Sequence, residues 1–141
     1  MEPRRNIVPL LGRTLLGLPF FFSGLNKIFA WGQTAGYMAA RGFPLVPLFL
    51  LAAVILEIGG SLSLFLGLRV KLGAAALLIF LIAATLIFHN FWAFMGAEKQ
   101  EQMINFMKNV AIMGGLLFVL TFGPGPMSFD GKRNRKSQNL D

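Results

Sequence analysis

The chain alternates between long apolar runs and short polar stretches. The apolar runs cover about residues 7–29, 45–66, 72–88 and 103–122. A helix needs about 20 mostly apolar residues to cross roughly 30 Å of hydrocarbon, and these runs are close to that length. The pattern therefore predicts an all-α fold, a bundle of four transmembrane helices.

Prolines, glycines and a short turn mark where the predicted spans begin and end. Pro44 and Pro47 begin the second span, because proline is tolerated in the first turn of a helix. Residues 123–126 read GPGP and end the fourth span, since this sequence cannot continue a helix. The turn at 67–71 is so short that the second and third spans are expected to be antiparallel neighbours.

Two segments lie outside the bundle. A short helix at the membrane surface is expected around residues 34–40, in the loop after the first span. Residues 131–141 form a basic and polar tail, GKRNRKSQNLD, whose composition predicts disorder. The domain assignment is therefore a membrane domain over residues 1–130 followed by this tail.

The composition agrees with a membrane protein, because 55% of the 141 residues are hydrophobic and only 13% are charged. The net charge of +7 could suggest a nucleic-acid partner. However, most Lys and Arg residues gather near the start, at the 67–71 turn and near the end. Since Lys and Arg are enriched in cytoplasmic loops, both termini are predicted to be cytoplasmic. The lipid bilayer is the expected partner, and nucleic acid is not.

The sequence has no cysteine and one histidine. Without cysteine, thiolate nucleophiles, disulfide relays, iron–sulfur clusters and cysteine zinc sites are excluded, and no metal site is expected. One histidine also excludes bis-histidine haem within one chain, although a haem shared across an oligomer stays open. Any electrons would therefore pass through a bound organic cofactor or a redox partner protein.

Arg13 and Glu57 are charged residues inside predicted spans. Counted from the cytoplasmic ends of their spans, Arg13 lies roughly 9 Å deep and Glu57 roughly 13 Å deep. A single charge at such a depth costs at least a few kcal/mol, so the similar depths predict a buried ion pair between them. A role for Glu57 as a proton carrier, or as a ligand for a substrate amine, stays open beside the structural role.

Polar side chains are concentrated between the third and fourth spans and are predicted to face outward. With one lysine from the first span, they form the candidate ligand-binding set: Lys27, His89, Asn90, Trp92, Gln102, Asn105, Lys108 and Asn109. Lys27, His89 and Lys108 are predicted to lie within about 8 Å of the outer interface. Such a cluster could hold the carbonyl oxygens of a quinone or a small oxyanion. Alternatively, the residues are interfacial anchors.

Short motifs follow one another along almost the whole chain. They are Arg13, Gly24 and Lys27, then EIGG at 57–60, HNFW at 89–92, MINFMKN at 103–109 and GPGP at 123–126 with Ser128 and Asp130. In this order and spacing they resemble the DoxX family of bacterial membrane proteins. The resemblance implies a four-helix, multi-pass protein of the bacterial inner membrane. The family takes its name from a subunit linked to thiosulfate:quinone oxidoreductase. The resemblance implies no particular substrate or catalytic residue.

Three functions are compatible with these observations. The first is a component of a quinone-linked redox system with an outer-leaflet polar pocket, where His89 exchanges protons and Lys108 stabilises negative charge. The second is a non-enzymatic bundle that anchors or stabilises a partner or binds lipid. The third is a small-molecule or proton-coupled carrier that acts as a homo-oligomer. Enzymatic activity stays open, and quinone is the cofactor to test.

Overall fold

The computed structural model describes residues 3–132. The elements in chain order are α1 (Pro3–Phe29), α2 (Trp31–Ala40), α3 (Val46–Leu66), α4 (Val70–Phe88), the short 3-10 helix η1 (Phe91–Ala93) and α5 (Gly96–Phe122). Within the described part, α1, α3, α4 with the η1 segment, and α5 are long and apolar enough to cross a membrane. The prediction of an all-α fold with four spans is confirmed.

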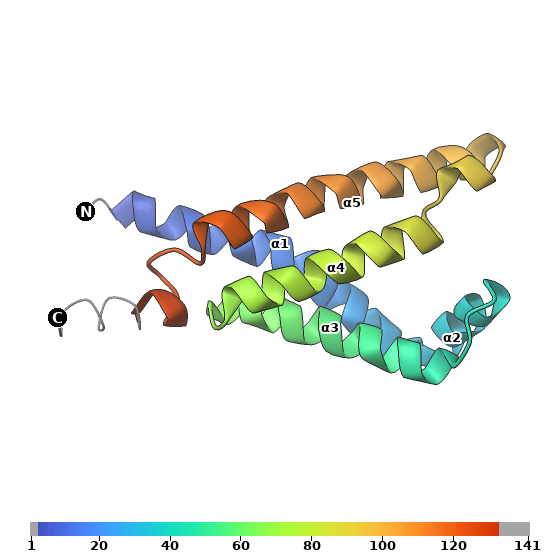
Figure 1. The fold of residues 1–141 in the computed structure, drawn as a ribbon, viewed down its shortest axis with the longest axis horizontal. Helices are drawn as coiled ribbons and strands as arrows, with labels where there is room; N and C mark the ends of the chain where they lie inside the picture. The colour runs from blue at the N-terminus through green and yellow to red at the C-terminus, as the bar shows by residue number, and fades with distance from the viewer. Residues whose placement is uncertain (1–2, 133–141) are drawn as a thin grey trace.

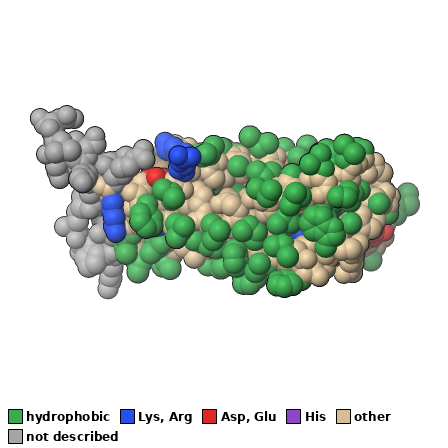
Figure 2. Space-filling model, turned by 90° about the horizontal axis from the view of Figure 1, so that it is seen from below, with side chains coloured by type: hydrophobic (Ala, Val, Ile, Leu, Met, Phe, Trp, Pro, Cys, Tyr) green, Lys and Arg blue, Asp and Glu red, His purple; other side chains and the backbone are tan. Residues whose placement is uncertain are grey.

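The surface of the described residues is apolar along the length of the bundle. Figure 2 shows hydrophobic side chains over most of one face, with Lys and Arg gathered near one end. Each long helix contributes exposed apolar residues, including Leu15, Ile55, Ile79 and Phe118, which are 61–70% exposed. A contiguous apolar surface of this extent marks contact with an apolar environment, here the lipid.

The helix α5 begins earlier than the apolar pattern predicted, at Gly96 instead of about residue 103. Its added turns are polar and include Glu98 and Lys99. Glu, Lys and Gln favour helix, and an acidic residue in the first turn interacts favourably with the helix dipole. The polar stretch therefore extends the helix beyond the apolar span.

The four long helices pack in chain order as neighbours and are held together most closely at one end. α1 packs mainly on α3, and α4 packs on both α3 and α5. Figure 1 shows α3 and α4 side by side at their connecting turn and farther apart toward the other end. The buried core lies on the side of the turn and consists of Phe20, Leu64, Val70, Ala74, Leu77, Leu81 and Leu116. The bundle is therefore closely packed at one end and open at the other.

Residues 123–132 fold back over the closely packed end, after α5 has stopped at Gly123. Arg13 from α1 is 2% exposed, and its guanidinium donates hydrogen bonds to the backbone carbonyls of Pro124 and Met127. Because GPGP does not form a helix, these carbonyls are available to accept. We call this region the clamped end. Residues 133–141, most of the predicted tail, lie outside the described residues.

Asp130 completes the clamped end by capping α4. Its carboxylate accepts hydrogen bonds from the backbone N–H of Arg69 at 3.0 Å and of Val70 at 2.9 Å. Its own N–H donates to the carbonyl of Gly67 at 2.9 Å. Gly67 has a φ of +71°, and a Cβ there would lie 2.4 Å from the Cβ of Ser128, so only glycine fits.

The start of α1 and residues 123–132 lie at the same end of the bundle, as four spans require (Figure 1). That this end is cytoplasmic stays a prediction, which rests on the distribution of Lys and Arg. The opposite end consists of α2 and the loop at residues 89–95, and we call it the open end.

Glycines set the register between α1 and α3. At Gly24 an added Cβ would lie 2.8 Å from Ile58 Cδ1, and at Gly17 it would lie 2.6 Å from Phe65 Cε1. The backbone of α1 therefore approaches α3 closely at both positions. This register places the last turn of α1 beside the middle of α3, and α2 continues the chain toward the open end.

Candidate functional site

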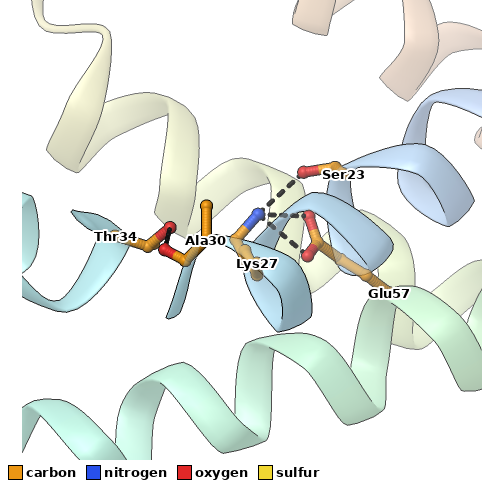
Figure 3. Close-up of polar contacts among 5 residues, drawn as sticks. All are labelled: Ser23, Lys27, Ala30, Thr34 and Glu57. Carbon is orange, nitrogen blue, oxygen red and sulfur yellow. Dashed lines mark hydrogen bonds and ion pairs between the residues drawn. The ribbon is translucent and has the colours of Figure 1, made fainter. Parts of the chain in front are cut away.

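A buried ion pair joins α1 to α3. Lys27 Nζ lies 2.9 Å from Glu57 Oε2 and 3.0 Å from Oε1, and it donates to Ser23 Oγ at 2.7 Å (Figure 3). Glu57 is 3% exposed, and no described residue donates a hydrogen bond to its Oε2, which is in ion-pair contact with Lys27. The hydrogen bonds to Ser23 and to Glu57 Oε1 use two of the three donors of the Lys27 ammonium.

The predicted ion pair between Arg13 and Glu57 is therefore wrong. Arg13 lies beside Gly67, where α3 ends, while Glu57 pairs with Lys27. The prediction counted each depth from the end of its own apolar run. However, α1 begins at Pro3, before its apolar run. The close approaches at Gly17 and Gly24, and not the ends of the apolar runs, set the position of α1 along α3.

Lys27 also lies deeper than predicted. It pairs with Glu57, which follows the first residue of α3, Val46, by eleven residues, or roughly 16 Å of helix. α1 ends at Phe29, so the chain turns into α2 well inside the length of α3. Lys27 thus lies deeper along the bundle than its apolar run indicated, and its distance from the outer interface stays a prediction.

A cavity of about 580 Å³ adjoins this ion pair and extends toward the open end, and all five α-helices line it. Its polar lining residues are Ser23, Asn26, Lys27, Thr34, Tyr37, Glu57, His89, Lys108 and Asn109. Four of the eight candidate ligand-binding residues are among them: Lys27, His89, Lys108 and Asn109. The structure thus gathers half of the predicted set around one cavity, whereas whether they bind a ligand stays a prediction.

Two other candidate ligand-binding residues contact lining residues without lining the cavity themselves. Gln102 Oε1 lies 2.8 Å from His89 Nδ1, and Asn105 Oδ1 accepts a hydrogen bond from Lys108 Nζ at 3.0 Å. An amide oxygen only accepts, so Nδ1 of His89 carries the proton that it donates to Gln102. The Nε2 atom of the neutral ring is then left as an acceptor. Gln102 and Asn105 therefore orient His89 and Lys108 instead of lining the cavity.

Asn109 is the most deeply buried of the predicted amides. It is 8% exposed, and its Nδ2 donates to Thr85 Oγ1 at 3.0 Å, which joins α5 to α4. This bond uses one of the two donors of the amide. Asn109 therefore both links α5 to α4 and presents its remaining polar atoms near the cavity.

Asn90 and Trp92 do not line the cavity. Asn90 Oδ1 is buried, and no described residue donates a hydrogen bond to it. Trp92 is 58% exposed and packs edge to face against Phe91 and Phe106, with ring centroids 5.3 and 6.1 Å away. This position fits the alternative role of Trp92 as an interfacial anchor.

Aromatic rings form the wall of the cavity at the open end. Phe43 and Phe88 are stacked with centroids 5.6 Å apart and an interplanar angle of 12°, and Tyr37 lies 5.8 Å from Phe88. Arg41 donates a hydrogen bond to the hydroxyl of Tyr37 at 3.0 Å, and its guanidinium lies over the ring of Phe94 at 5.1 Å. Arg41 thereby connects α2 to the loop between α4 and α5.

Four further residues line the cavity although the sequence pattern did not predict them: Ser23, Asn26, Thr34 and Tyr37. A signal for Ser23 was present, because it precedes Lys27 by four residues and so shares its helical face. No comparable signal marked Tyr37, since its position depends on how α2 lies against α3.

Comparison with known proteins places the chain among membrane proteins. The DoxX family model matches residues 8–90, and the SURF4 family model matches residues 58–136. Inner membrane protein YphA of Escherichia coli is 31% identical over 126 residues, which cover 89% of this chain and 90% of that protein. Inner membrane protein YqjF of the same organism is 33% identical over 137 residues, which cover 96% and 99%.

A more distant similarity extends to a yeast protein. The ER-derived vesicles protein ERV29 of Saccharomyces cerevisiae is 27% identical over 72% of this chain and 35% of its own length. No solved structure matches the chain. The two bacterial relatives cover nearly the whole chain, and four apolar helices are present in the described part. The chain is an integral, multi-pass protein of the inner membrane, and it belongs to the DoxX family.

Proposed function

We propose that this protein is the membrane component of a quinone-linked redox system and that its cavity holds a quinone headgroup. The observation that carries the proposal is one cavity that combines aromatic walls with polar groups from α1, α4 and α5. Its volume of about 580 Å³ lies in the range of typical ligand sites, about 300–1,000 Å³.

The polar groups that remain free at the cavity are mostly hydrogen-bond donors. Lys108 uses one N–H on Asn105, so two remain. The hydroxyl of Tyr37 accepts from Arg41 and keeps its own proton to donate. A quinone presents two carbonyl oxygens, and these acceptors complement such donors.

The aromatic wall supports the same ligand class. A flat ring packs favourably in an offset stack on aromatic side chains, and Phe43 and Phe88 are already arranged in parallel. The cavity also lies within the apolar length of the bundle, where a membrane-soluble ligand is available.

His89 is the residue that we propose for proton exchange with the bound ligand. Its Nδ1 is occupied by Gln102, which fixes the ring and leaves Nε2 to exchange a proton. The sequence contains no cysteine, so the electrons are proposed to come from a redox partner protein. The residues of this chain would then bind and orient the ligand.

The test is the quinone content of the purified protein. The wild-type protein is extracted from quinone-containing membranes, and bound quinone is measured by solvent extraction and chromatography. His89→Ala and Lys108→Ala should each reduce the bound quinone at least fivefold, because each removes a polar group at the cavity.

Lys99→Ala is the matched control, since Lys99 is an exposed lysine of α5 that does not line the cavity. Its quinone content should equal that of the wild type. Unchanged quinone content in both cavity variants, or absence of quinone from the wild type, would contradict the proposal.

A second candidate function is a bundle that binds lipid or stabilises a partner without chemistry. The observation that favours it is the trio Ser23, Lys27 and Glu57, in which Glu57 already neutralises the charge of Lys27 and so can serve to hold α1 on α3. Mass spectrometry of the purified protein separates the two functions. Phospholipid in place of quinone would support the second.

A further inference from the structure

The cavity reaches the surface of the bundle on two sides. Between α3 and α4, the lining residues are themselves exposed; they are Phe49, Ala52, Leu56, Ala83 and Ile87. Because these residues both line the cavity and lie on the surface, the cavity opens toward the lipid between the two helices. We call this the apolar opening.

On the other side, the cavity opens between α1 and α5. There the exposed lining residues are Pro19, Asn26 and Lys108. The two helices meet closely at Leu16 and Gly115, where an added Cβ would lie 2.5 Å from Leu16 Cδ2, and the opening lies beyond this contact toward the open end. This rim carries an amide and an ammonium, so we call it the polar opening.

The two openings differ in the chemistry they tolerate. The apolar opening has no polar side chain at its rim, and two of its five residues are alanines, which leave room for a chain to pass. The polar opening would place a hydrocarbon chain against Lys108, which must keep its charge solvated or paired. A ligand with one polar and one apolar end therefore has one favourable orientation.

We propose that a ligand with a single long apolar chain binds with its headgroup at Lys27 and Lys108 and its chain leaving between α3 and α4 into the lipid. This inference rests on the proposed function and specifies its ligand as an isoprenoid-tailed quinone that enters sideways from the bilayer. A water-soluble ligand has no apolar chain that could occupy the apolar opening.

The experiment narrows the apolar opening with tryptophan. Affinities of the purified protein in detergent are measured by calorimetry for two probes, a dimethoxy-methyl-benzoquinone with a decyl chain and the same ring without the chain. Ala83→Trp should weaken binding of the decyl probe at least tenfold, because the indole occupies the path of the chain. Binding of the short probe should change less than twofold.

Ala52→Trp tests the same opening from α3 and should give the same pattern. Ala111→Trp is the matched control, because Ala111 is an exposed alanine of α5 that does not line the cavity. Both probes should bind to it as to the wild type. Thermal unfolding of each variant confirms that it is folded before binding is compared.

The outcomes separate this inference from the proposed function. If the wild type binds neither probe, the proposed function fails and the inference fails with it. If the wild type binds both probes, but Ala52→Trp and Ala83→Trp weaken binding of both probes equally or of neither, only the route of the chain is wrong. Equal wild-type affinity for the two probes would also overturn the route, because the chain would then contribute nothing.

Discussion

The two ends of the bundle stabilise their charged side chains in different ways. At the clamped end, Arg13 and Asp130 bind backbone atoms, namely two carbonyls after α5 and two N–H groups at the start of α4. Toward the open end, Lys27 and Glu57 bind each other beside a cavity. Backbone partners are fixed by the fold, whereas a pair of side chains can rearrange when a ligand arrives. The difference separates a structural region from a candidate functional one.

The two ends of the bundle also differ in how densely their side chains are packed. The buried core lies on the side of the α3–α4 turn, and Gly67 permits Ser128 and Arg13 to approach within van der Waals contact. At the open end, α2 buries only Met38 among its own residues, and Arg41 ties it to the loop at 89–95. Regions with few buried contacts open at low free energy, which suits an entry site.

The largest effect is expected from Arg13→Ala at the clamped end. It removes two hydrogen bonds from a charged group, each contributing about 1.5–3 kcal/mol, so the free energy of unfolding should fall by about 3 kcal/mol. Thermal or denaturant unfolding in detergent measures the change. Arg69→Ala removes an exposed basic side chain from the same end and should change stability by less than about 0.5 kcal/mol. Similar stabilities of the two variants would show that the hydrogen bonds of Arg13 contribute little to the free energy of unfolding.

A smaller effect is expected for the ion pair near the cavity. Glu57→Gln leaves Lys27 without its counter-charge and should destabilise by about 2 kcal/mol, less than for a fully buried pair because the Lys27 side chain is 20% exposed. In a double-mutant cycle with Lys27→Met, the coupling energy should be about 1–3 kcal/mol.

The same cycle with Arg13→Ala in place of Lys27→Met is the control. Arg13 and Glu57 have separate partners, so their effects should add to within about 0.5 kcal/mol. Strong coupling between Arg13 and Glu57, without coupling between Lys27 and Glu57, would contradict the register of α1 on α3.

The smallest effect is expected from Asp130→Asn. The variant keeps one acceptor oxygen but loses the charge near the start of α4 and one of two caps, so stability should fall by about 1 kcal/mol. Glu101→Gln changes an exposed acidic residue of α5 and should have no measurable effect. A stability of Asp130→Asn equal to the wild type would show that capping by the C-terminal segment contributes nothing.

The sequence predicted the membrane spans well and the site in part. His89, Lys108 and Asn109 were predicted to gather because they lie close to the ends of apolar runs, and they do line one cavity. The ion pair was assigned to Arg13 instead of Lys27, because depth along a single helix carries no information about its register on a neighbour.

The sequence by itself determined the class of the protein, since apolar run length, charge distribution and motif order depend only on local composition and spacing. Only the tertiary structure decided which charges meet. Close approaches at Gly17 and Gly24 fix how α1 lies on α3, and the fold-back of residues 123–132 supplies the partners of Arg13. These contacts join residues far apart in the chain, so packing, and not periodicity, brings Lys27 to Glu57.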